Sequence, residues 1–337
     1  MKNGWKKIAG GLLALAAVLT AAFLVFRGHW QEIRESLRAV PLWGTAAMLA
    51  LAAGYQMLES GVCASLVRAR LPGFSLRQAV EVTFLGVFGN VATFAAGSMP
   101  MQSLLLHKYG LTYGHGVGLL TVDYIFHKSS ILLYASVMLL FQGSWLRDAC
   151  PDLSRYLLLG YVVCGAVAAA LVLVCAWEKM ERLALKLIGL LPETGKWPKR
   201  KEAWRTNLES LYTESQHVLK DRACCGRVLA LNAGKLLCLY TAAWLSIRLL
   251  GADGLSFWQA QLLASLMLLI ASALPNIAGV GPAEFAFLML FTRFMPYAQA
   301  SAALLLYRTA TYFFPFAVSI FLTLWVQRRR FASPGRP

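Results

Sequence analysis

The chain has 337 residues, of which 58% are hydrophobic and 14% are charged, whereas soluble domains carry about 25% charged residues. Together with a mean hydropathy of +0.58, this excludes the soluble two-domain protein that the length alone would suggest. The 18 Phe, 12 Tyr and 10 Trp residues exclude an intrinsically disordered chain. The net charge of +16 would indicate nucleic acid in a soluble protein. In a membrane protein it indicates topology and contact with anionic lipid instead.

Apolar runs predict about six membrane-spanning helices, because roughly 20 helical residues cross a hydrocarbon core of about 30 Å. The first run, 8–26, follows Lys2, Lys6 and Lys7, so a cleaved signal peptide is the alternative interpretation. We favour a retained anchor because the run continues without a break past the small residues at 20–22. The other runs lie at 42–66, 115–141, 156–176, 227–250 and 299–327. Six spans place both termini on one side of the membrane.

Two further apolar stretches are interrupted by Gly and Pro, which end helices. The first, 78–106, contains Gly97-Ser98-Met99-Pro100, and the second, 257–294, contains a Gly- and Pro-rich segment at 275–282. Bare backbone at membrane depth must be covered by protein or face a water-filled cavity. We therefore interpret each stretch as a re-entrant or broken helical hairpin. Two ordinary spans joined by a surface turn are the alternative, above all for 257–294.

These elements predict an all-α polytopic integral membrane protein with a single membrane domain. A first half, 42–176, and a second half, 227–327, each contain one broken hairpin and have opposite orientations, with a basic tail at 328–337. Interrupted segments at corresponding positions of two oppositely oriented halves are typical of inverted-repeat transporters. No residue-level similarity between the halves supports this interpretation, so it rests on hydropathy and the positions of the breaks.

The segment 177–226 between the halves is polar, basic and predicted to be cytoplasmic. Within it, an apolar stripe recurs at helical spacing, with charged residues away from it. The stripe contains Trp204, Leu208, Leu211, Tyr212, Ser215, Val218 and Leu219, and the residues away from it are Arg205, Glu209, Glu214 and Lys220. This pattern indicates an amphipathic helix, either lying on the membrane surface or packing against the protein's own helices.

Ionisable residues inside the apolar runs are costly, at roughly 2.5 to 3.5 kcal/mol for Arg, Lys or Asp at mid-helix, so they mark functional candidates. Asp123 and His127 stand four residues apart, on one helix face, and could pair. Such a pair could carry a proton, since histidine titrates near neutral pH, contact a headgroup, or act only as a structural clamp between helices. The full set is Glu59, Glu81, Asp123, His127, Lys128, Lys235, Glu284 and Arg308.

Glu284 and Arg308 are the strongest candidates of this set. Pro282 suits the first position of a helix, which would place Glu284 in the first turn, where the helix dipole favours a carboxylate. The free N–H groups of such a turn also bind anions. Arg308 lies far from both ends of its run, and its guanidinium can bind phosphate oxygens bidentately. The alternative is an internal salt bridge between Glu284 and Arg308, with no ligand.

At these residues the sequence resembles the lysylphosphatidylglycerol synthase transmembrane family, the membrane portion of the multiple peptide resistance factors. The resemblance rests on Pro275, Gly279-Val280-Gly281-Pro282-Ala283-Glu284, Leu306-Tyr307-Arg308, Tyr312 and Pro315. A weaker motif in the first hairpin includes Gly89-Asn90 and Gly97-Ser98-Met99-Pro100. Family members usually carry an arginine and then a Gly-acid pair after that proline. This chain has Met101-Gln102-Ser103-Leu104 there, which departs from the pattern for headgroup contact.

The resemblance implies lipid handling. A separate synthase domain makes the aminoacylated lipid in the two-part resistance factors, and the chain ends at Pro337, so we expect no enzymatic activity. We expect a flippase for a phospholipid, aminoacyl-phospholipid or polyprenyl phosphate in the cell membrane, with both termini cytoplasmic and an anionic inner leaflet as partner. The candidate substrate-binding residues are Asn90, Ser98, Asp123, His127, Lys128, Lys235, Gly279, Gly281, Glu284 and Arg308.

Three other functions stay open: an ion or small-solute transporter, a non-transporting partner of a lipid or glycan enzyme, and a membrane-embedded lipid-modifying enzyme. No cofactor or metal is expected, because the seven cysteines include no Cys-x-x-Cys pair. His107, His115 and His217 are isolated in sequence, and the chain could form a homo-oligomer. The predicted inner segments hold 22 Lys or Arg against seven acids, and the outer segments six against five. The charge excess therefore indicates orientation, not nucleic-acid binding.

Overall fold

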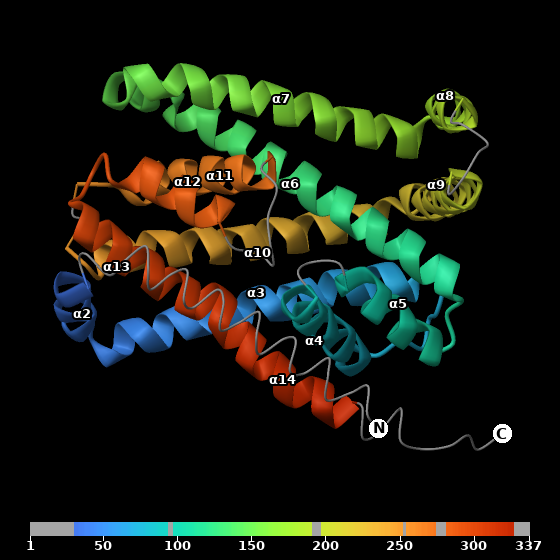
Figure 1. Cartoon of the computed structure of the whole chain (residues 1–337), viewed down its shortest axis with the longest axis horizontal. Coiled ribbons are helices and arrows are strands. Elements are labelled where there is room, and N and C mark those ends of the chain that lie inside the picture. The colour runs from blue at the N-terminus through green and yellow to red at the C-terminus, as the bar shows by residue number, and fades with distance from the viewer. Residues whose placement is uncertain (1–29, 94–96, 191–196, 252–253, 274–280, 327–337) are drawn as a thin grey trace.

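A computed structural model describes residues 30–93, 97–190, 197–251, 254–273 and 281–326, and within this part every regular element is a helix (Figure 1). The predicted anchor at 8–26, the basic tail at 328–337 and Gly279 lie outside the described residues. The prediction of an all-helical chain is therefore confirmed over the part that the structure describes.

Long helices cover the five remaining predicted runs: α3 (Leu42–Arg68), α6 (Tyr113–Ala149), α7 (Pro151–Ala176), α10 (Arg222–Arg248) and the continuous stretch Tyr297–Val326. By length and composition, α6, α10 and Tyr297–Val326 could each cross a membrane. Two bent pairs raise the number to as many as five. They join α2 (Trp30–Arg38) to α3 at 92° and α7 to α8 (Glu178–Gly189) at 103°. The sixth predicted span is the run outside the described residues.

Each predicted broken stretch forms two short helices that pack against each other. The first contains α4 (Leu76–Ala92) and α5 (Ser98–Lys108), and the second contains α11 (Phe257–Ala273) and α12 (Pro282–Phe291). At 1.5 Å per residue, the 11 residues of α5 and the 10 residues of α12 extend only about 15 Å, half of a hydrocarbon core. Neither stretch is therefore a pair of full-length spans.

Local sequence explains where these hairpin helices begin. Ser75 caps α4, because its hydroxyl accepts from the Gln78 backbone N–H at 3.2 Å while the Gln78 side chain accepts from the Ser75 N–H at 2.7 Å. Pro282 begins α12, as predicted, and Glu284 lies in its first turn. In the first hairpin, a Cβ added to Gly89 would lie 2.8 Å from the carbonyl oxygen of Gly97. The absence of a side chain thus lets the hairpin fold back tightly.

The two halves of the chain interlock and do not form two separate bundles. α3 packs along α10, and each hairpin contacts the other half: α4 packs against α14 (Phe314–Val326), and α11 packs against α6 and α7. Within the second half, α11 packs against α12 and α10 packs against α13 (Tyr297–Arg308), which leads into α14. In Figure 1, α4 and α5 lie at one end of the molecule and α11 and α12 lie toward the other.

The polar segment between the halves forms α8 and α9 (Trp197–Lys220), which lie at the same end as α5 (Figure 1). α9 contacts α6, α7 and α10, and Val218 is fully buried in the core formed with α3 and α6. Of the two interpretations left open by the sequence, packing against the protein's own helices is therefore correct for this face. Trp204 and Leu219, although part of the predicted stripe, stay substantially exposed.

Candidate functional site

A polar cavity of about 260 Å³ lies where the first hairpin meets α3 and the last span. Its walls include Asn90 and Ser98 on either side of the hairpin break, Glu59 on α3, and Tyr312 near the end of the chain. The structure thus brings the two residues proposed from the first hairpin to one cavity. They line it together with groups from the opposite half.

A second cavity of about 150 Å³ adjoins the first, because Tyr55, Gln56, Thr311 and Pro315 line both. Arg308 lines this smaller cavity. The two spaces connect the surroundings of the first hairpin break with those of the start of α12, since Ala283 belongs to the second lining. Both interrupted stretches, 78–106 and 257–294, therefore face adjoining cavities between the halves.

Arg308 is held by the first turn of α12. Its Nε donates to Glu284 Oε1 at 2.7 Å, and the other carboxylate oxygen of Glu284 accepts from the Gly281 N–H, also at 2.7 Å. Gly281 adopts φ = +105°, which side-chain-bearing residues rarely do, so glycine is needed at this position. The salt bridge that the sequence offered as one alternative is thus present. It positions the guanidinium at the cavity wall, where 13% of the side chain is exposed.

A widened turn follows Arg308. Residues Thr309–Phe313 form a π-helical segment between α13 and α14. Pro315 has no N–H to donate to the carbonyl of Thr311, which removes one α-helical hydrogen bond here. The segment carries Thr311 and Tyr312 into the cavity lining, and the Arg308 guanidinium lies 4.4 Å from the Tyr312 ring centre. Such single π-turns are frequent at functional sites.

A buried group of charges lies beside the larger cavity. Lys235 on α10 is 1% exposed, and its ammonium donates to Glu59 on α3, which is 27% exposed and lines the cavity. The Lys235 nitrogen also lies 5.9 Å from the Tyr55 ring centre. Asp123 on α6 is within electrostatic range of both Glu59 and Lys235. We call Glu59, Asp123 and Lys235 the charge cluster.

Asp123 and His127 do not form the hydrogen-bonded pair that their spacing allowed. Asp123 Oδ1 and His127 Nδ1 are both buried without a hydrogen-bond partner. Asp123 lies within electrostatic range of Glu59 and Lys235, whereas His127 lies against Asn232 on α10. Spacing of four residues puts two side chains on one helix face, but the neighbouring helices decide which groups they meet.

The candidate residues therefore divide into three groups. Asn90, Ser98 and Arg308 line the two cavities, with Glu284 and Gly281 behind Arg308. Asp123, His127 and Lys235 lie in the buried polar region between α3, α6 and α10. Lys128 lies apart, with its ammonium 5.2 Å from the ring centre of the exposed Tyr124.

Sequence reasoning missed several lining residues, including Tyr55, Gln56, Thr311 and Tyr312. Gln56 is a polar residue inside an apolar run, is 7% exposed, and has an Oε1 without a partner. That combination of polarity and position could have marked it. Glu59 was recognised as costly, but its pairing with Lys235 depends on the contact between α3 and α10, which the sequence does not reveal.

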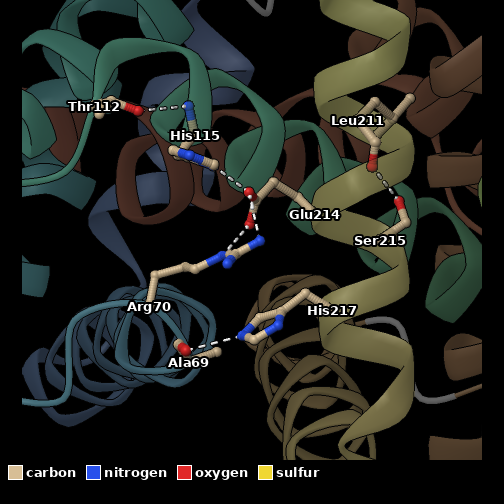
Figure 2. Close-up of polar contacts among 8 residues, drawn as sticks. All are labelled: Ala69, Arg70, Thr112, His115, Leu211, Glu214, Ser215 and His217. Atoms are coloured by element: carbon tan, nitrogen blue, oxygen red, sulfur yellow. Dashed lines mark hydrogen bonds and ion pairs between the residues drawn. The ribbon is translucent and has the colours of Figure 1, made fainter.

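A second polar arrangement, outside the cavities, fixes α9 to the helix ends near α5 (Figure 2). The Glu214 carboxylate is fully buried and accepts two hydrogen bonds of 3.1 Å from Arg70 and a third contact from His115. His217 contacts the carbonyl of Ala69 at 3.0 Å. The prediction that Glu214 points away from the buried stripe is wrong. Arg70 and His115 supply the partners that compensate the buried carboxylate.

The sequence pattern of the lysylphosphatidylglycerol synthase transmembrane region matches residues 8–319, which is nearly the whole chain. The chain belongs to this family. The matched range contains both broken hairpins, the charge cluster and Arg308. Among curated proteins, none matches the sequence at a significant level.

Membership identifies a transmembrane domain of a family with lipid-related functions, which agrees with the long apolar helices. The geometry adds what such a domain offers chemically. A guanidinium, amide and hydroxyl groups line two adjoining cavities, and a helix N-terminus lies behind the guanidinium. These are donors suited to a phosphate or carboxylate oxygen.

Proposed function

We propose that this protein moves an anionic, phosphate-bearing lipid between the leaflets of the cell membrane, and that it acts as a transporter and not as an enzyme. A phospholipid, an aminoacyl-phospholipid or a polyprenyl phosphate would meet this description. The observation that carries the proposal is the joining of the two cavities, which places Arg308 next to the polar groups of the first hairpin. A headgroup could lie there while its chains stay in the bilayer.

The volumes support a headgroup and not a whole lipid. Cavities of about 260 and 150 Å³ are below or near the lower end of ordinary small-molecule sites, roughly 300 to 1,000 Å³. In this proposal the phosphate shares the Arg308 guanidinium with Glu284, which already accepts one of its N–H groups. The five donors of a guanidinium allow two acceptors at once.

We also propose that the contacts of each hairpin with the other half reflect an inverted repeat, with the α8 and α9 end facing the anionic cytoplasmic leaflet and both termini on that side. Because α3 and α10 pack along each other, we propose that the two hairpins move against this central pair. Alternating access would then depend on the turns at Gly97 and Gly281.

The test is lipid translocation by the purified protein in proteoliposomes. Phosphatidylglycerol carrying a fluorescent label is placed in both leaflets, and the fraction that becomes accessible to an external quencher is followed over time. We expect Arg308→Ala to slow translocation at least tenfold and Arg205→Ala, which removes an exposed arginine paired with Glu209 on α9, to leave it unchanged. Equal rates in wild-type protein, Arg308→Ala and protein-free vesicles would refute the proposal.

The small cavity volume also favours a second candidate, transport of an inorganic anion or a small solute. In that case the same vesicles would accumulate labelled phosphate or another small anion without moving the fluorescent lipid. The lipid assay and the uptake assay use the same preparation, so the two functions are separated directly. Arg308→Ala is expected to lower whichever activity is present.

A further inference from the structure

We propose that Asp123 is a proton-binding site whose occupancy is set by competition between Asp123 and Glu59 for the Lys235 ammonium. The proposal rests on the charge cluster beside the transport cavity. It deepens the proposed function, because Glu59 both belongs to that cluster and lines the cavity.

Among the described acidic residues inside the helix bundle, Asp123 differs from the others because it forms no ion pair. Glu59 pairs with Lys235, Glu81 with Arg77 at 3.5 Å, Glu214 with Arg70, and Glu284 with Arg308. Asp123 has no such cation, and its Oδ1 is buried without any hydrogen-bond partner. An ionised Oδ1 in that position would lack a hydrogen-bond donor and a directly paired cation, which is unfavourable.

Charge balance points the same way. With both carboxylates ionised, Glu59, Asp123 and Lys235 carry a net charge of −1 in a region enclosed by α3, α6 and α10. Binding one proton makes the cluster neutral. Because Lys235 already donates to Glu59, the proton belongs on Asp123, which becomes a carboxylic acid. The proton comes from water through the polar cavity and returns there when the acid ionises.

The other titratable groups around Asp123 do not replace it. The Tyr55 hydroxyl and the Cys63 thiol belong to residue types that ordinarily lose their protons above pH 7, and His127 on α6 faces Asn232. Lys128 lies against Tyr124. On α10, Lys235 is the one cation in the cluster, and Tyr312 of the cavity lining lies beside Arg308. Asp123 and Glu59 are thus the two carboxylates that compete for one ammonium.

Infrared spectroscopy of the purified protein in detergent tests the site without any transport measurement. A protonated carboxylic acid shows a carbonyl stretching band that an ionised carboxylate lacks. We expect wild-type protein to show such a band at pH 7, far above the ordinary aspartate pKa of about 3.9, and Asp123→Asn to lose it. A band unchanged in Asp123→Asn, or its absence at pH 7 in wild-type protein, would overturn the proposal.

The sharper variant is Glu59→Gln, which leaves Asp123 in place but removes its competitor. Lys235 would then be the counter-charge of Asp123 alone, so Asp123 should ionise and the band should disappear at pH 7. Both variants keep the cluster neutral, so both are expected to fold; Glu284→Gln, outside the cluster, should keep the band. Persistence of the full Asp123 band in Glu59→Gln would show that the two carboxylates do not compete, contrary to the proposal.

The link to transport is measured separately in the proteoliposome assay. We expect the wild-type translocation rate of labelled phosphatidylglycerol to change at least threefold between pH 6 and pH 8, and the rate of Asp123→Asn to be independent of pH over that range. If no lipid is translocated at all, the proposed function fails while the infrared result still decides the proton site. An unchanged pH dependence in Asp123→Asn would refute the coupling.

Discussion

The contacts in Figure 2 allow a quantitative prediction for Glu214→Ala, because the anchoring of α9 depends on one buried carboxylate. Glu214 is fully buried, whereas its partners Arg70 and His115 are 28% and 44% exposed. Hydrogen bonds to a charged group contribute about 1.5 to 3 kcal/mol each. Removing the carboxylate lets both partners regain water, so we discount the sum to about 2 kcal/mol.

A loss of about 2 kcal/mol reduces the ratio of docked to undocked α9 roughly 30-fold, since 1.4 kcal/mol corresponds to a factor of ten. Hydrogen–deuterium exchange measures this ratio directly, because backbone amides of α9 exchange faster when the helix leaves its position. Glu214→Ala should therefore raise exchange of α9 by a similar factor in detergent or nanodiscs. Exchange within the central helices α3 and α10 should stay close to wild type.

Arg205→Ala is the matched control, because the Arg205–Glu209 pair on α9 is solvent-exposed on both sides. Exposed pairs of this kind contribute little to stability, so exchange should change by no more than about twofold. Unchanged α9 exchange in Glu214→Ala would refute the idea that this carboxylate holds the helix. Equal acceleration by both variants would mean that general helix stability, and not docking, controls exchange.

Three further variants test other parts of the fold. Gly89→Ala should lower the free energy of unfolding by about 1 to 3 kcal/mol, because its Cβ would meet a backbone oxygen at 2.8 Å, whereas Gly143→Ala, with nothing within 4 Å, should be neutral or stabilising in thermal denaturation. Lys235→Met should destabilise by about 3 to 5 kcal/mol and be largely rescued by adding Glu59→Gln in a double-mutant cycle. Burial, followed by repulsion from two nearby glutamates, raises the pKa of Glu181. The folded state therefore binds a proton more readily than the unfolded state, so the packing of α8 on α9 should become more stable as the pH falls through that pKa. Amide exchange of α8 measures this dependence on pH, and Glu181→Gln should abolish it.

Local sequence signals predicted the helix positions and, within the site, the part formed by Glu284 and Arg308. Pro282 and Glu284 begin α12 because their preferences depend only on neighbouring residues, and Arg308 was recognised because a charge in an apolar run needs a partner. The π-helical turn was not predicted. It depends on how the span accommodates Pro315, for which several local solutions exist.

Contacts between distant helices could not be predicted from the sequence. Glu59 and Lys235 are separated by 176 positions in the chain, and each could have paired with another of the ionisable residues. The position of Glu214 could not be predicted either. A charged residue on an amphipathic helix is expected to be exposed, but Glu214 is fully buried. Its burial becomes favourable only because Arg70, from the turn after α3, and His115, from the first turn of α6, contact it.

The interlocked packing also constrains the order in which the chain can assemble. α4 packs against α14, and α6 packs against α11, so both helices of the first half are synthesised before the helices that they contact in the second half. At ribosomal rates of about 5 to 20 residues per second, α4 is exposed for roughly 10 to 50 seconds before α14 is synthesised. During that interval its unsatisfied face is open to lipid, insertion factors or proteases. Mutations in α14 should therefore lower the yield of inserted protein even when they leave the finished structure intact.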